Sequence, residues 1–152
     1  MKTTVKEQKI RHVLVAVDGS ANADRAVKAA AQIAKNNDAE LTVLHIIVIP
    51  PAVYSGDVPF DIGKIESEAR REAERIVSDA SSLAEEKGIK PKKAIVQHMD
   101  SAVRGIAEYA DENTMDLIVV GTRGLGGFKR LLLGSVASGV VHYAHCSVLI
   151  VR

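Results

Sequence analysis

Apolar segments of two kinds alternate along the whole chain, and this alternation constrains the fold more than any other feature of the sequence. Short runs rich in valine, isoleucine and leucine, typical of buried strands, are separated by longer segments whose apolar residues recur at helical spacing. Because the strand-like runs are almost continuously apolar, both faces of their sheet must be covered. The sequence therefore predicts a doubly wound α/β fold, a parallel sheet with helices on both faces.

Five strands and four helices follow from this pattern. The predicted strands are residues 12–17, 41–49, 93–98, 116–120 and 147–151. The predicted helices run from 21 to about 36, from about 65 to a stop at Gly88, from 101 to 113 and from 135 to 145. Residues 50–59 contain three prolines, which predicts a long loop because proline fixes φ and donates no hydrogen bond. In the common strand order 3-2-1-4-5, ligands bind at the switch between strands one and four.

The composition bounds the size of the fold and excludes several classes of function. With 152 residues, 47% of them hydrophobic, the chain can form one domain over residues 1–152 without disulfides or a structural metal. Twenty basic and nineteen acidic residues give no overall field that would favour nucleic acid or an anionic membrane. There is no tryptophan, and five tyrosines and phenylalanines offer little surface for stacking bases. We therefore expect neither nucleic acid nor a membrane as a partner.

Cysteine usage and the N-terminal sequence bear on the compartment. Cys146 is the one cysteine of the chain, so no intramolecular disulfide can form. The sequence has no apolar leader and no run of 18 apolar residues. A soluble, cytoplasmic protein is the expectation.

A glycine-rich, cationic segment follows the fourth predicted strand. Its pattern is Gly121, two residues, Gly124, nine residues, Gly134 and then Ser135. The pattern ends at the start of a predicted helix. Glycine lets the main chain approach a ligand closely, and the free N–H groups and dipole of a helix start favour negative charge. This segment is predicted to bind an anion, and phosphate is the first ligand to consider.

Two widespread phosphate motifs do not fit the segment. The P-loop needs lysine and then serine or threonine directly after its second glycine, whereas Gly126 is followed by Gly127. The dinucleotide fingerprint needs a glycine where Lys129 stands, and it belongs after the first strand rather than the fourth. Binding of NAD or a flavin therefore loses its main support.

The glycine spacing resembles that of the ATP-binding subset of the universal stress protein family, whose pattern is glycine, two residues, glycine, nine residues, glycine, then serine or threonine. Residues 13–20 also resemble the family's first strand and turn, and residues 116–121 its fourth strand, so the resemblance covers nearly the whole chain. It implies binding of ATP, or of ADP or AMP, with Mg²⁺ as the accompanying ion. It also implies a homodimer through the last strand, Val148–Val151, and a role in stress response or signalling.

The resemblance also implies a set of site residues. Those near the base and ribose would be Ala16, Val17, Asp18 and Ile46. Those around the phosphates would be Gly121, Arg123, Gly124, Gly134, Ser135 and Val136. Nucleotide occupancy is expected to alter conformation, dimerisation or partner binding.

Simpler interpretations stand beside these assignments. Ser135 has the residue type of an ordinary helix N-cap, and Asp18 before a glycine has that of a turn residue. His142, His145 and Cys146 lie close in sequence, but a helix end turns such residues to different faces, so no metal site is predicted. No catalytic set is recognised either. The alternatives are an interaction protein of the same fold that does not bind ATP, and a slow ATPase.

Overall fold

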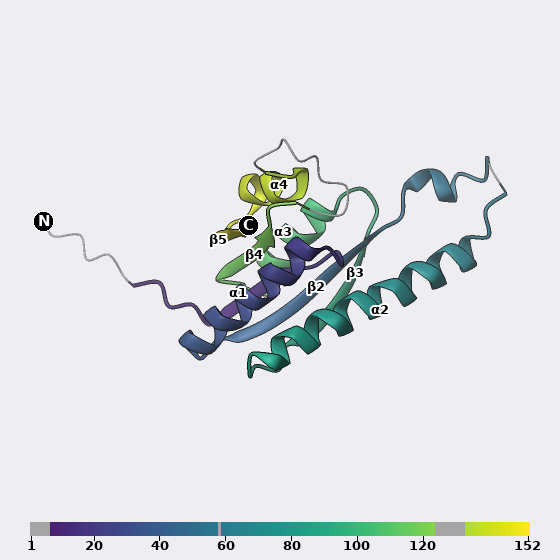
Figure 1. Cartoon of the computed structure of the whole chain (residues 1–152). Helices are drawn as coiled ribbons and strands as arrows, with labels where there is room; N and C mark the ends of the chain where they lie inside the picture. The colour runs from purple at the N-terminus through teal and green to yellow at the C-terminus, as the bar shows by residue number, and fades with distance from the viewer. Residues whose placement is uncertain (1–6, 58, 124–132) are drawn as a thin grey trace, which may run out of the picture.

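The chain forms a five-stranded parallel sheet in the order β3-β2-β1-β4-β5, with helices on both faces (Figure 1). This description comes from a computed structural model and covers residues 7–57, 59–123 and 133–152. The strands are β1 (His12–Ala16), β2 (Glu40–Val48), β3 (Lys92–His98), β4 (Leu117–Gly121) and β5 (Ser147–Val151). The helices are α1 (Ala21–Asn37), α2 (Ile62–Glu86), α3 (Ala102–Glu112) and α4 (Ser135–Tyr143). The predicted fold class and strand order are confirmed.

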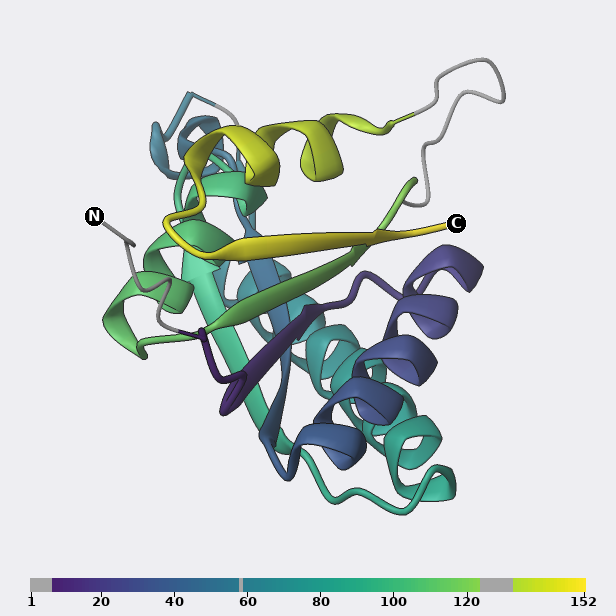
Figure 2. The same ribbon diagram turned by 90° about the vertical axis from the view of Figure 1, so that its left-hand side faces the viewer.

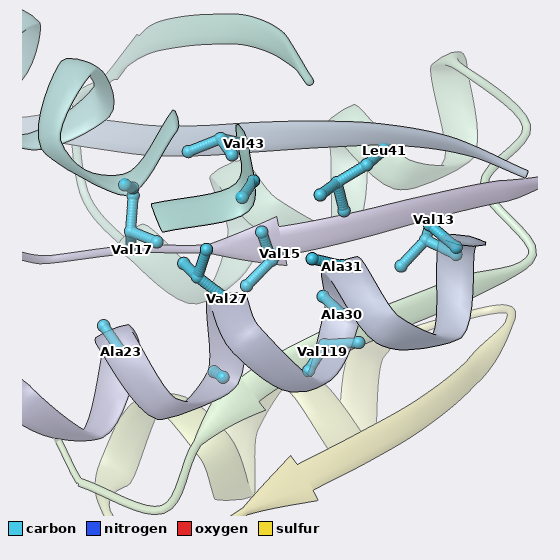
Figure 3. Packing of buried hydrophobic residues seen from close by; sticks show 14 of the residues in the cluster. Val13, Val15, Val17, Ala23, Val27, Ala30, Ala31, Leu41, Val43 and Val119 are labelled. Carbon is cyan, nitrogen blue, oxygen red and sulfur yellow. The ribbon is translucent and has the colours of Figure 1, made fainter. Parts of the chain in front are cut away.

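The side chains of β1 alternate between two hydrophobic clusters, one on each face of the sheet. Val13 and Val15 pack with α1 and α2, as Figure 3 shows for the α1 side. Leu14 points the other way and packs with residues of α3 and α4. All three are fully buried, which explains why residues 13–15 are all apolar. The two helical layers lie on opposite sides of the sheet in Figure 2.

Side-chain caps explain where three of the helices begin. The Ser20 hydroxyl accepts the Ala23 N–H at 3.2 Å and caps α1. Asp61 caps α2 by accepting the Lys64 N–H at 3.0 Å. Ser101 caps α3. Each cap satisfies one of the N–H groups that a helix start leaves without a partner.

The segment between β2 and α2 differs from the predicted loop. Pro51–Tyr54 form a short 3-10 helix, which tolerates Pro51 because the first helical residue needs no hydrogen-bonded N–H. Val53 packs against a small cluster, and the Tyr54 hydroxyl donates to Glu66 of α2 at 2.7 Å. The helix α2 begins at Ile62, before the predicted start, and its buried residues begin only at Ala73. Its first turns extend past the sheet (Figure 1), so no apolar pattern marks them.

None of the helices within the described ranges is both long and apolar enough to cross a membrane.

Candidate functional site

The sheet splits at the carboxyl ends of its two central strands. Pairing between β1 and β4 runs from Val13–Leu117 to Val15–Val119. Beyond this point β1 remains paired with β2, and β4 remains paired with β5 as far as Gly121–Val151. This divergence is the topological switch of the fold, where parallel α/β sheets bind their ligands. The predicted site residues lie on the segments that lead away from it.

The turn from β1 into α1 forms one side of the split. Its Gly19 has a φ of +83°, in the left-handed region that favours glycine. Asp18 is half-buried, and its Oδ1 accepts the Ser20 N–H at 2.9 Å. The local turn role expected for Asp18 is therefore present. In the described part of the chain Oδ2 makes no hydrogen bond, so this oxygen can accept one from a ligand.

Val17 directly follows β1, but its side chain points away from Ala16 and Ile46. It is 6% exposed and belongs to the cluster beneath α1 and α2 (Figure 3). The main chain is also engaged, since the Val17 N–H donates to Leu44 O at 2.9 Å and Val17 O lies 2.7 Å from His45 Nδ1. A carbonyl oxygen can only accept, so His45 carries a proton on Nδ1. His45 is not among the predicted site residues, because in the sequence it is only a polar residue within an apolar strand.

Ala16 and Ile46 lie on the same face of the sheet, the face that α3 and α4 cover. Ile46 is 9% exposed and packs directly beneath α3. A Cβ atom at Gly105 of α3 would lie 3.0 Å from Ile46 Cγ2, so the helix and the side chain are in tight contact. The structure thus brings Ala16 and Ile46 to one face, with Ile46 largely covered.

The glycine-rich segment closes back on itself beside β4. The Gly134 N–H donates to Thr122 O at 2.6 Å, which brings the two ends of the segment together. A Cβ atom at Gly134 would lie 3.0 Å from that oxygen and 3.4 Å from Arg123 Cα, so a side chain has little room there. Arg123 and Gly134, both predicted to lie near the phosphates, are therefore neighbours. Gly124 lies outside the described residues.

The start of α4 presents main-chain donors at the same place. Gly134 is the N-cap and has no side chain to satisfy the first amides, so the alternative in which Ser135 is the N-cap is wrong. Ser135 and Val136 are the first two residues of α4, and both are exposed. Within the described ranges, no acceptor bonds their N–H groups. Such donors, together with the helix dipole, can hold an anion.

Gly121 brings the first turn of α1 against the end of β4. A Cβ atom at Gly121 would lie 2.9 Å from the main chain of Asn22, so only glycine allows this approach. Beside the contact lies a pocket of about 320 Å³, lined by Asn22, Arg25, Thr122, Arg123 and Arg152. Of these residues only Arg123 belongs to the predicted site. The others belong to no sequence motif. Arg25, for example, has the sequence context of an ordinary exposed helical arginine, and only the packing of α1 against β4 brings it to the pocket.

The last part of the chain offers little for metal binding or nucleophilic chemistry. In the described part of the chain no three histidine, cysteine, aspartate or glutamate residues are grouped to bind a metal ion. His142 Nδ1 lies 3.2 Å from Ser138 O, one turn back in α4. Partial burial raises the pKa of the Cys146 thiol, so the reactive thiolate is disfavoured at neutral pH.

Comparisons with known proteins agree with this geometry. The sequence profile described as "Universal stress protein family" matches residues 9–152. Universal stress protein YxiE of Bacillus subtilis is 36% identical over 146 residues, which cover 92% of this chain and 97% of that protein. Universal stress protein UspA from Lactobacillus plantarum has a similar structure, with a TM-score of 0.79, 26% identity and coverage of 96% of this chain and 100% of that one. A universal stress protein solved in complex with cAMP has a TM-score of 0.71 and 27% identity, covering 95% and 99% of the two chains.

Proposed function

This chain belongs to the universal stress protein family, and from that premise we propose that it binds an adenine nucleotide where β1 and β4 diverge. The observation that carries the proposal is the start of α4, whose amides have no side-chain cap and which Gly134 anchors to Thr122. A related universal stress protein was solved with cAMP, which contains adenine, ribose and a phosphate. ATP is the proposed ligand here, with ADP or AMP as alternatives and Mg²⁺ as the accompanying ion.

Each predicted site residue has a place in this proposal. Asp18 would accept a hydrogen bond from the ribose through Oδ2. Ala16 and the edge of Ile46 would contact the base, while Val17 would contribute only its peptide plane because its side chain is in the core. The residues proposed around the phosphates are Gly121, Arg123, Gly124, Gly134, Ser135 and Val136.

The proposed role is that of a cytoplasmic binding module in stress response or signalling. Nucleotide contacts spread over residues 121–136 would stabilise one arrangement of this segment, which lies between β4 and α4. A ligand shifts a conformational equilibrium only by its difference in affinity for the two states, so the segment must bind nucleotide in one arrangement better than in another. The bound state would then alter dimerisation through β5 or the binding of a protein partner.

Calorimetric titration of nucleotide-free protein with ATP and Mg²⁺ tests the proposal. We expect saturable binding to the wild type and loss of binding in Gly134→Val, because this side chain would collide with Thr122 O and Arg123. The matched control is Gly63→Val on the exposed start of α2, where the nearest atom to an added Cβ is Asp61 Oδ1 at 3.6 Å. This control should bind like the wild type.

Titrations with ADP, AMP and cAMP identify the preferred nucleotide, and release of inorganic phosphate from ATP tests the slow ATPase alternative. Absence of binding for all four nucleotides would contradict the proposal and favour the interaction protein that does not use ATP. Hydrogen exchange across residues 121–136 gives a second test. Unchanged protection at saturating ATP would exclude the coupling between occupancy and this segment.

A further inference from the structure

We propose that the pocket between α1 and the ends of β4 and β5 is a second anion site, specific for phosphate groups. Three arginines line this pocket, Arg25 from α1, Arg123 after β4 and Arg152 after β5, together with Asn22 and Thr122. They come from three separate parts of the sequence. In Figure 2 the end of β5 lies beside the start of α1.

The local charge of the pocket favours an anion. The whole chain has a formal net charge of only +1, yet three arginines line one pocket of about 320 Å³. None of the three forms an ion pair with a carboxylate among residues 7–57, 59–123 and 133–152. Arginines that line a cavity without a carboxylate partner repel one another, and a bound anion removes that repulsion.

A hydroxyl-bearing side chain also lines the pocket. Thr122 is 5% exposed and still lines the pocket. Its main chain is fully used, because the N–H donates to Val151 O at 2.9 Å and the carbonyl accepts from Gly134. Beside the pocket, its hydroxyl can donate a hydrogen bond to a ligand oxygen.

The first turn of α1 supplies main-chain donors and orients one arginine. Asn22 is the second residue of this helix of 17 residues, so its N–H belongs to the positive end of the helix dipole. The Asn22 Oδ1 accepts a hydrogen bond from Arg25 Nη2, which fixes the plane of that guanidinium. Gly121 makes this arrangement possible, because a side chain there would push the turn of α1 away from β4.

The chemistry of these donors selects phosphate among common anions. Guanidinium groups from three directions, a hydroxyl and a helix start can each bond a different oxygen of a tetrahedral group, whereas a planar carboxylate offers two oxygens. The source of the phosphate is either a free anion such as pyrophosphate or the terminal phosphates of a bound nucleotide. Arg123 belongs to both the pocket and the glycine-rich segment, so the two sites are adjacent.

Titration of the full chain with sodium pyrophosphate, followed by calorimetry and by NMR chemical shifts, tests this second site. We expect Arg25→Gln and Arg152→Gln each to weaken pyrophosphate binding about tenfold or more, because each removes a charge-assisted hydrogen bond. The control is Arg71→Gln, an exposed arginine on α2 outside the pocket. Thr122→Val keeps the shape and removes the hydroxyl, and a smaller loss of affinity is expected. Far-ultraviolet circular dichroism checks that all four variants remain folded.

Parallel titrations with AMP and ATP distinguish the two sources. If Arg25→Gln weakens ATP but leaves AMP unchanged, the pocket receives the terminal phosphates of the nucleotide. If pyrophosphate binds equally well to protein saturated with AMP, and Arg25→Gln affects neither nucleotide, the pocket is an independent site for a free anion. Either result supports the second site.

Two results would overturn the second site. One is that pyrophosphate does not bind at all. The other is that it binds equally well to wild type, Arg25→Gln and Arg152→Gln. Because neither arginine is among the proposed nucleotide contacts, AMP binding to these variants remains a separate measure of the nucleotide site.

Discussion

At the scale of single residues, two glycines without side chains are as important for the proposed site as the side chains that surround it. Gly121 and Gly134 belong to the glycine motif that is predicted to bind phosphate. The structure adds that Gly121 lies against Asn22 with no room for a Cβ atom, and that Gly134 lies against Thr122 with little room for one. These glycines therefore allow α1, β4 and the start of α4 to pack closely. Their replacement should affect packing and binding at the same time.

Charged side chains on the surface give a prediction about pH. The hydrogen bond from Lys92, at 2.8 Å between Lys92 Nζ and Glu40 Oε2, lowers the pKa of Glu40 below its usual range. A lowered folded-state pKa stabilises the fold above the ordinary glutamate pKa of about 4.3, and this contribution is lost as the pH falls through the lowered value. The difference in unfolding free energy between wild type and Glu40→Gln should therefore shrink in acid.

Urea unfolding between pH 2.5 and about 7 measures this difference. The effect should be small and should fall further in high salt, because both side chains are more than half exposed. Glu85→Gln on α2 is the control, since Glu85 is exposed and forms no ion pair within the described residues. A difference between wild type and Glu40→Gln that stays constant down to the lowest pH would contradict the prediction.

At the scale of elements, the helices α3 and α4 form a closely packed pair on one face of the sheet. Gly139 of α4 faces Val103 of α3, and a Cβ atom at Gly139 would lie 2.7 Å from Val103 Cγ2 and 2.8 Å from Cγ1. A valine side chain cannot move aside easily because its branch lies at Cβ. The small residue at Gly139 thus sets how closely α4, which carries the proposed phosphate donors, approaches α3.

We predict that Gly139→Ala destabilises the protein by on the order of 1 kcal/mol, although alanine favours an isolated helix by about 1 kcal/mol over glycine. The collision with Val103 should outweigh the helix propensity. In a Val103→Ala background the same substitution should become neutral or stabilising. Urea unfolding of the four proteins of this double-mutant cycle measures the coupling, and additive effects would show that the contact does not limit packing. Gly63→Ala, which meets no close atom, should be neutral or stabilising.

At the scale of the whole molecule, the sheet has two edges, β3 and β5. The Val151 carbonyl accepts the Thr122 N–H, so the main chain of Val151 faces β4. Because successive residues of a strand direct their N–H and C=O groups to opposite sides, Val148 and Ile150 present theirs to the free edge. An unpaired edge of apolar residues favours pairing with another chain, which supports the proposed homodimer through Val148–Val151.

Ile150→Pro tests this dimer. Proline removes the outward N–H of the edge but leaves the hydrogen bonds between β4 and β5, so we expect a folded monomer by light scattering where the wild type is a dimer. Leu149→Pro is the matched comparison, because its N–H faces β4 and its loss should lower stability. A wild-type monomer, or a dimer that persists in folded Ile150→Pro, would contradict dimerisation through this edge.

The sequence predicted most of the fold because its local patterns and its tertiary structure agree. The strand from Ser147 to Val151 is found within its predicted bounds, and the first four strands differ from prediction by a residue at one or both ends. The largest departure is the start of α2, where exposed turns carry no apolar periodicity and Asp61 sets the boundary. Helix boundaries at exposed ends depend on single capping residues. These are harder to recognise in a sequence than the repeated apolar residues of a buried face.

The alternating strands and helices, the parallel sheet and the glycine spacing after β4 can be predicted from the sequence, because strand and helix periodicity and glycine geometry are local properties. Which of these residues face one another depends on tertiary packing. It turned the side chain of Val17 into the core, made Gly134 rather than Ser135 the N-cap of α4, and gathered Arg25, Arg123 and Arg152 around one pocket. These outcomes depend on how closely α1 and α4 approach the ends of the strands, a distance set by contacts between residues far apart in the chain.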